Sequence, residues 1–342
     1  MFCKLKLYFF VFALLMLPIV NIFSADKDKP VMEAYLFAYF EGSGPREVQE
    51  QLRFGVSKDA VNWYALNDNK PIIPSDSISQ TGGIRDPHIL RAEDGTGFYI
   101  VATDMFTMKN GWGFNPGIVM MKSDDLINWK HAYIDFASAY PKSFSEVQWV
   151  WAPQTIYDCK VGKYLVYFTI RFKGSQNLDF YSAYANEDFT AFEEEPKLMF
   201  RAKDGAIDGD IILRDGKYHF FFKGNSKDEN GKEYINGIKQ AIGTSLQGPW
   251  EEHFEYLDAY AGKTVVEGSS VFKLNDSDSY VLMYDLYTNL RYEFQRSEDL
   301  INFTKTPEVF TKNFNPRHGS VIGITVEELN RLNKRWGGDP NH

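Results

Sequence analysis

The sequence has few cysteines, no excess of basic charge and only one long apolar run. Its 342 residues include two cysteines, Cys3 and Cys159, and 37 basic against 46 acidic side chains, which gives a formal net charge of −9. A nucleic-acid partner is not expected, because binding to a phosphate backbone requires a basic surface. After the N-terminal run no apolar stretch approaches the ~20 residues that span a bilayer, so we expect no membrane span in the mature chain.

The apolar run lies close to the N-terminus. Two lysines precede it, it extends from Leu7 to about Phe23, and small residues follow it. This order is typical of a secretory signal peptide and predicts residues 1–24 as a leader on a secreted or periplasmic protein. An uncleaved membrane anchor is the alternative. Removal of the leader would leave only Cys159, so we expect no internal disulfide in the mature chain.

Aromatic side chains are abundant, and some recur at a regular interval. They make up 16% of the residues, which favours strands and surfaces for flat ligands such as sugars. Five times, a small polar residue is followed six positions later by an aromatic residue, at intervals of about 60 residues. The pairs are Ser57 and Trp63, Ser123 and Trp129, Asn186 and Phe192, Thr244 and Trp250, and Ser297 and Phe303. Each pair follows a run whose pattern is typical of a strand.

A repeat of this length, with three or four short strands and no long helix, is typical of a propeller blade. The five copies predict an all-β fold, a single five-bladed β-propeller over residues 25–342, with the repeated aromatic side chains packed between blades. A β-sandwich with coincidental turns is the alternative. The first repeat lacks an opening strand and residues 316–325 form a spare one, so we expect pairing of the N- and C-terminal strands to close the ring. Residues 326–336 predict a short surface helix.

Carboxylates occur in the segments that open three of the repeats. Asp86 lies in RDPHIL, Asp208 in AIDGDIIL and Glu267 in VEGSSVF, at separations of two blades and one blade. Because the opening strands line the central channel, we expect these side chains at equivalent positions around one axial pocket. Such a group suits glycoside hydrolysis, which needs a protonated acid at the leaving oxygen and an ionised carboxylate on the other side. A third carboxylate would raise the pKa of the acid. Capping of turn amides is the alternative role for each.

These motifs resemble glycoside hydrolase family 43, a family of five-bladed arabinofuranosidases, xylosidases and arabinanases, over about residues 32–325. The resemblance implies that Asp86 is the general base, that Asp208 tunes and orients the acid, and that Glu267 protonates the leaving group. It also implies inversion, with base and acid about 6.5–9.5 Å apart, and no required cofactor. Asp210, two residues beyond Asp208, is the rival for the tuning role. The sequence departs from the family in placing a blade-like segment before the base and in having Gln154 after the WAP motif, where an acid is common.

Further side chains are candidates for the pocket. Trp151 is a candidate platform for a sugar ring, with packing between blades as the alternative. Gln154 is a candidate substrate contact, and Arg85 and Arg291 are candidates for binding sugar hydroxyls, with ion pairing as the alternative. For His318 the resemblance suggests a place near a central water or a structural Ca²⁺ ion close to the propeller axis, with a hydrogen bond to the backbone as the alternative.

Together these observations predict an exported inverting glycoside hydrolase whose partner is an oligosaccharide or polysaccharide. The leading hypothesis is an exo-acting α-L-arabinofuranosidase or β-D-xylosidase acting on plant polysaccharide fragments. An arabinan endo-hydrolase, a family 32-like fructosidase and a non-catalytic sugar-binding propeller are the alternatives. The fructosidase lacks support, because no Asn-Asp-Pro motif occurs near the N-terminus and no cysteine follows Glu267.

Overall fold

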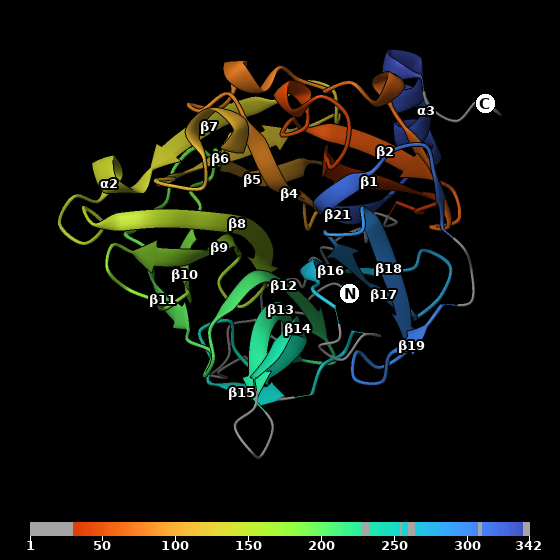
Figure 1. Ribbon diagram of the computed structural model, residues 1–342. Coiled ribbons are helices and arrows are strands. Elements are labelled where there is room, and N and C mark those ends of the chain that lie inside the picture. The colour runs from red at the N-terminus through yellow and green to blue at the C-terminus, as the bar shows by residue number, and fades with distance from the viewer. Residues whose placement is uncertain (1–29, 228–232, 254, 259–263, 307–309, 338–342) are drawn as a thin grey trace, which may run out of the picture.

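The chain forms a ring of five antiparallel sheets around a central axis (Figure 1). The structure is a computed structural model, and it describes residues 30–337 apart from 228–232, 254, 259–263 and 307–309. This is the predicted five-bladed, all-β propeller. Among the described residues no helix is long and apolar enough to cross a membrane.

Four blades each consist of four strands in chain order. The first contains β4 (Ile84–Arg91), β5 (Phe98–Asp104), β6 (Gly117–Ser123) and β7 (Lys130–Asp135). The second contains β8 (Val147–Asp158), β9 (Lys163–Phe172), β10 (Asp179–Tyr184) and β11 (Lys197–Phe200). The third contains β12 (Ala206–Arg214), β13 (Lys217–Lys227), β14 (Glu233–Gly243) and β15 (Trp250–His253). The fourth contains β16 (Glu267–Lys273), β17 (Tyr280–Leu286), β18 (Arg291–Ser297) and β19 (Thr304–Lys305).

The fifth blade joins both ends of the described chain. Its strands are β1 (Ala34–Glu41), β2 (Arg53–Ser57), β3 (Asn62–Ala65), β20 (Thr311–Lys312) and β21 (Pro316–Ile324). The innermost strand, β21, pairs antiparallel with β1, with Leu36 opposite Ile322. This confirms the predicted closure, in which the last strand covers the inner edge of β1. Figure 1 shows the first and last strands side by side.

In the part of the chain that the structure describes, helices are few and lie outside the sheets. Short helical turns occur as η1 (Arg46–Val48), η2 (Asn67–Asn69), η3 (Ser75–Ser77), α1 (Thr107–Asn110) and α2 (Phe136–Ala139). The longest described helix is α3 (Val326–Trp336), in the range where the sequence predicts one. Thr325 and Glu328 form a capping box at its start, and Leu329 and Leu332 are buried against the propeller.

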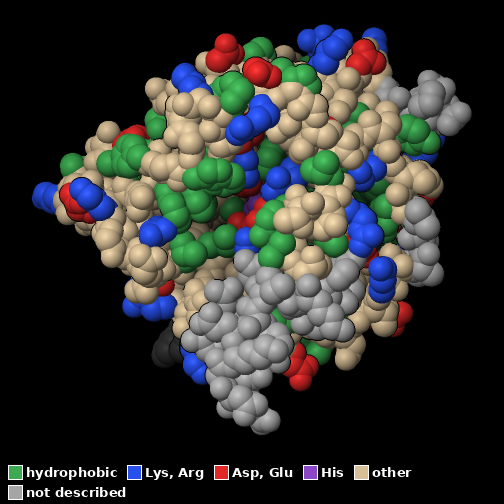
Figure 2. Space-filling view, in the orientation of Figure 1, with side chains coloured by type: hydrophobic (Ala, Val, Ile, Leu, Met, Phe, Trp, Pro, Cys, Tyr) green, Lys and Arg blue, Asp and Glu red, His purple; other side chains and the backbone are tan. Residues whose placement is uncertain are grey.

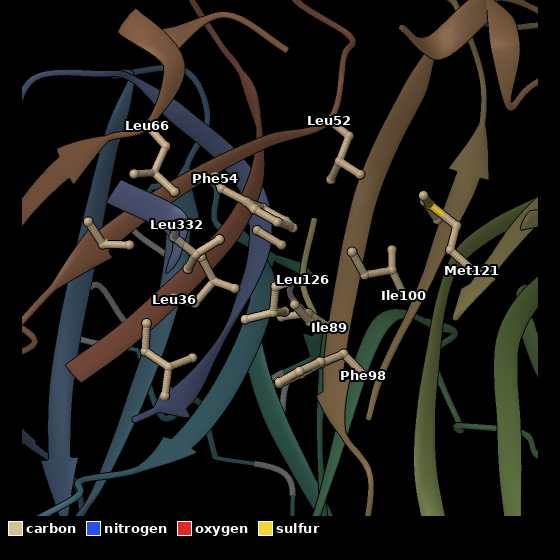
Figure 3. Close-up of a cluster of buried hydrophobic side chains, with 14 of the residues drawn as sticks. Leu36, Leu52, Phe54, Leu66, Ile89, Phe98, Ile100, Met121, Leu126 and Leu332 are labelled. Carbon is tan, nitrogen blue, oxygen red and sulfur yellow. The ribbon is translucent and has the colours of Figure 1, made fainter. Parts of the chain in front are cut away.

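Each interface between neighbouring blades holds its own hydrophobic cluster. The cluster between the fifth and first blades contains Leu36, Phe54, Phe98 and Leu332 of α3 (Figure 3). The aromatic residues of the repeat are distributed one to an interface: Trp129, Phe192, Trp63, Trp250 and Phe303. The predicted packing role is therefore confirmed, and it explains why an aromatic residue recurs in every blade.

The prediction that the mature chain has no internal disulfide stays a prediction. It concerns the chain without residues 1–24, and Cys3 and the predicted leader lie outside the described residues.

Candidate active site

The five inner strands share one local distortion. Each inner strand has one more residue than its paired strand at the same point of the ladder, which is a β-bulge. The bulges lie in β4, β8, β12, β16 and β21. The bulged residues are Asp86, Ala152, Asp208, Gly268 and His318. The first four have positive φ angles of 51°, 47°, 55° and 61°. Such values are uncommon for residues other than glycine and are found at functional sites.

The register corrects one part of the sequence prediction. Asp86 and Asp208 occupy equivalent bulge positions, but Glu267 is one residue earlier, opposite Asp285 of β17. Its equivalents are Ile207 in the third blade and Arg317 in the fifth. The three carboxylates therefore belong to two adjacent levels of the channel, and Glu267 meets different neighbours from the other two.

All three carboxylates line one pocket of about 190 Å³ at the start of the inner strands. Arg85, Trp151 and His318 line the same pocket, as expected from the sequence. Figure 2 shows a hollow near the centre of this face, with charged side chains of both signs inside it. The structure thus brings together six of the eight side chains that the sequence singled out.

Asp86 is held in the ionised form. One carboxylate oxygen accepts a hydrogen bond from Thr103 Oγ1 at 2.9 Å, and the other lies 3.2 Å from His318 Nδ1. Burial raises the pKa of Asp86, but the hydrogen bond and charge of His318, with smaller contributions from Arg85 and Thr103, bring it down to about 2. An ionised carboxylate that can accept a proton is what a general base requires.

His318 lies between two of the acids. Its Nδ1 is 3.2 Å from Asp86 Oδ1 and 3.9 Å from Asp208 Oδ1. Burial lowers the pKa of His318, but the charges of Asp208 and Asp86 outweigh this effect and raise it to about 9. The imidazole is therefore cationic at neutral pH and neutralises part of the acidic cluster.

A calcium ion near His318 stays a prediction. Calcium takes six to eight oxygen ligands, which include water and carbonyl oxygens, and no group of three or more His, Cys, Asp or Glu side chains that could hold a metal ion occurs within the described parts of the chain. The nearby carboxylate oxygens of Asp86 and Asp208 face the His318 ring. We derive no step of the chemistry through a metal.

Asp208 and its rival Asp210 face different spaces. Asp208 lines the pocket and accepts a hydrogen bond from the Gly268 amide at 3.2 Å. Its pKa is raised, mainly by burial and partly by the charge of Glu267, while His318 opposes the rise. Asp210 accepts from the Val271 amide at 2.6 Å and lines a separate cavity of about 630 Å³. That cavity is larger, but Asp86, Asp208 and Glu267 are outside its lining, so we place the chemistry in the smaller pocket.

Glu267 is clamped by two cations. Lys223 Nζ of β13 lies 2.9 Å from Oε2, and Arg317 Nη2 of β21 lies 2.7 Å from Oε1. Burial raises the pKa of Glu267, but Lys223 and Arg317 outweigh it and lower the pKa. The sequence predicted the opposite direction, because it showed the neighbouring carboxylate and not the two cations.

Trp151 and Arg85 form one wall of the pocket. The Trp151 ring stacks on Trp149, with centroids 4.1 Å apart and planes 9° apart. Arg85 pairs with Glu50 at 2.6 Å, and its guanidinium lies over Phe40 at 4.5 Å from the ring centroid. The ion-pair alternative for Arg85 is therefore observed, while the side chain still lines the pocket.

Arg291 and Gln154 lie outside the described lining of the pocket. Arg291 is at the start of β18, half-exposed and paired with Glu293 at 2.6 Å. Gln154 is buried one level further along the channel and accepts a hydrogen bond from Tyr167 at 3.2 Å. The structure does not bring these two side chains to the acids.

Sequence reasoning missed four functional neighbours. Lys223 and Thr103 come from second strands, and Trp112 from the connection between α1 and β6. None of them belongs to a recognisable motif. Arg317 had a signal, because it directly precedes His318 in the PRHGS run.

Comparisons with known proteins agree with this geometry. The model of a family described as "Probable glycosyl hydrolase domain", related to glycoside hydrolase family 43, matches residues 30–330. An α-L-arabinofuranosidase of Bifidobacterium longum is 24% identical over 66% of this chain, which spans about a quarter of that relative's length. A thermostable family-43 glycoside hydrolase superposes with a TM-score of 0.55 at 13% identity, over 83% of this chain and 93% of the other. An endo-arabinase from Bacteroides thetaiotaomicron superposes at 0.53 with 17% identity, over 87% and 94%.

A closed five-bladed propeller with an acidic axial pocket defines the class of the protein. Because the family model covers nearly all of the described chain, the protein belongs to the glycoside hydrolase family 43-related domains.

Proposed function

We propose that the chain is an exported, exo-acting, inverting α-L-arabinofuranosidase or β-D-xylosidase that releases terminal sugars from plant polysaccharide fragments. The observation that carries the proposal is the convergence of Asp86, Asp208 and Glu267 in one pocket. Its volume of about 190 Å³ is below the ~300–1,000 Å³ typical of sites for larger ligands. A space of this size suits a single terminal sugar better than a chain, which favours exo over endo action.

In the proposed reaction, Asp86 takes a proton from water as the water oxygen bonds to the anomeric carbon. The bond to the leaving oxygen breaks, and Glu267 donates a proton to that oxygen. Asp208 acts on Glu267 through its charge and through the hydrogen bond that it accepts from the Gly268 amide, which belongs to the peptide bond directly after Glu267. The low pKa of Asp86 keeps this carboxyl group ionised, which is the form that a general base needs.

Glu267 can act as the acid only when it is protonated, although Lys223 and Arg317 are paired with it. A general acid must carry a proton, and Lys223 and Arg317 oppose protonation in the unliganded pocket. We propose that the leaving oxygen takes the place of one cation at Glu267 when substrate binds. Loss of an opposite charge and exclusion of water both raise the pKa of a carboxyl group, so occupancy would prepare the acid.

The assignment to arabinofuranose is supported by the name of the curated relative, and export by the predicted leader. The test is turnover of p-nitrophenyl α-L-arabinofuranoside and β-D-xyloside, followed by product profiles on arabinan, xylan and arabinogalactan oligosaccharides. An exo enzyme yields a single sugar from the outset, and proton NMR of the first product shows the inverted anomer.

The variants Glu267→Gln and Asp86→Asn are expected to lose at least ~100-fold in turnover while they stay folded. Asp188→Asn, the same type of change at an exposed turn, is the matched control. If the wild-type protein binds these oligosaccharides without cleaving any, the proposal is wrong and the sugar-binding propeller is favoured.

A further inference from the structure

A large aromatic side chain stands exposed at the entrance of the pocket. Trp112 lines the pocket wall, yet 58% of its surface is accessible to solvent, and Phe114, two residues later, is 64% accessible. Isolated exposed apolar residues need no explanation, but exposed aromatic surface that continues from a binding pocket indicates an interaction site. Figure 2 shows hydrophobic side chains gathered along one side of the central hollow, over the region of β8 in Figure 1.

The Trp112 ring is supported from inside the pocket. Its ring centroid lies 5.0 Å from the Arg85 guanidinium carbon, and its edge meets Trp151 with centroids 6.3 Å apart. Arg85 is itself held by Glu50 and by the Phe40 ring. These contacts fix the orientation of the indole while leaving more than half of it uncovered.

The connection that carries Trp112 is anchored at both ends. At its start, the Thr107 amide and hydroxyl both donate to the Glu50 carboxylate at 2.6 Å. At its end, Asn115 is buried and accepts a hydrogen bond from Trp151 Nε1 at 2.6 Å. In between, the Gly113 carbonyl accepts from Trp149 Nε1 at 2.7 Å. The exposed ring is therefore pre-organised, which lowers the entropic cost of binding.

We propose that Trp112 is a stacking platform for the sugar residue on the leaving-group side of the cleaved bond, so that the natural substrate is an oligosaccharide. This inference rests on the proposed function. The pocket itself accommodates the terminal sugar, and Trp112 is the exposed continuation of its wall. A pyranose or furanose ring has an apolar face of C–H groups that packs on an indole, while its hydroxyls remain in water.

The experiment compares two substrates that differ only on the leaving-group side: a methyl glycoside and the corresponding oligosaccharide, in the arabinose or the xylose series according to wild-type turnover. For Trp112→Ala, kcat/KM is expected to fall about tenfold more on the oligosaccharide than on the methyl glycoside. Trp112→Phe keeps a stacking face and is expected to recover most of the loss. Met108→Ala, a truncation of an exposed apolar side chain in α1 of the same connection, is the control and leaves both values unchanged.

Equal losses on the two substrates, or no loss on either, would overturn the proposal. So would a change of oligomeric state in Trp112→Ala by light scattering, because Trp112 would then contact a second copy of the chain. A wild-type protein inactive on both substrates contradicts the proposed function instead. In that case, calorimetry of oligosaccharide binding to Glu267→Gln, with and without Trp112→Ala, still decides the matter: an unchanged affinity refutes the platform.

Discussion

The clamp on Glu267 gives a prediction about the pH dependence of catalysis. Lys223 Nζ lies 2.9 Å from the Glu267 carboxylate, and the two side chains are only 11% and 17% exposed, so solvent screens the pair weakly. An opposite charge at such a distance lowers a carboxyl pKa by about 1–3 units. Arg317 stays in place and still opposes protonation when Lys223 is replaced, so for Lys223→Met we expect the pKa of Glu267 to rise by a part of this general range, at about 1.4 kcal/mol for each unit.

The sign follows from the role of Glu267. A general acid loses activity when it loses its proton, so its pKa determines the alkaline limb of the pH profile of kcat/KM, which reports the free enzyme. Lys223 holds this pKa down, and Lys223→Met therefore moves the alkaline limb towards higher pH. The absolute rate has no bearing on this shift, which separates an electrostatic role from lost contacts with substrate.

The assay is kcat/KM on an aryl arabinofuranoside or xyloside between about pH 3 and pH 9, a range that covers the carboxyl and histidine pKa values. Lys223→Arg retains the charge and is expected to keep the wild-type limb. Lys217→Met, at the exposed start of the same strand, is the matched control. An alkaline limb that stays in place in Lys223→Met, or moves towards acid, would refute the reasoning.

Two further predictions concern the same pocket. In Gly268→Ala the new Cβ would lie 2.8 Å from His318 Cγ, so activity should fall by at least ~10-fold. Gly216 also has a positive φ, but the space around it is open, so Gly216→Ala should lose stability and keep its activity. Measured kcat/KM for the two variants checks this, and equal values would contradict it. The pKa of His318 is about 9 in the folded protein, against 6.5 in the unfolded chain, so this group contributes up to about 3 kcal/mol to the free energy of unfolding. The contribution is complete below pH 6.5 and is lost as the pH rises through 9. Thermal melts should show this decline in the wild type and a smaller one in His318→Gln.

The architecture was predictable because it repeats. An aromatic residue in the same place in five segments, such as Trp63 and Trp129, reflects five equivalent interfaces, and each interface is visible in the sequence as a local pattern. The closure by β21 was predictable for a related reason: the first repeat lacked a strand and the C-terminal segment supplied one. Repetition also placed Asp86 and Asp208 correctly on inner strands that face one pocket.

The electrostatics of the site were not predictable in the same way. Lys223 lies on a second strand opposite Ile207 and reaches across to the next blade, a contact that depends on register and on the packing of two sheets. Arg291 was a reasonable candidate by residue type, but Glu293 is two positions along the same strand and on the same face, and pairs with it. Side chains outside the repeated pattern leave no signal of their distance from the axis.

The bulge explains why the acids differ in character although all three line one pocket. A bulged residue such as Asp86 or Asp208 has its carboxylate close to the His318 ring, which occupies the same level of the fifth blade. Glu267 precedes the bulge, so it shares its level with Arg317 and faces Lys223 from the neighbouring blade. A shift of one residue along a strand thus separates a carboxylate paired with an imidazolium from one held by two permanent cations. If Glu267 is the proton donor, the bulge and not the acid itself determines how readily it is protonated, and substitutions of Lys223 and Arg317 should alter the pH profile while those of distant charges do not.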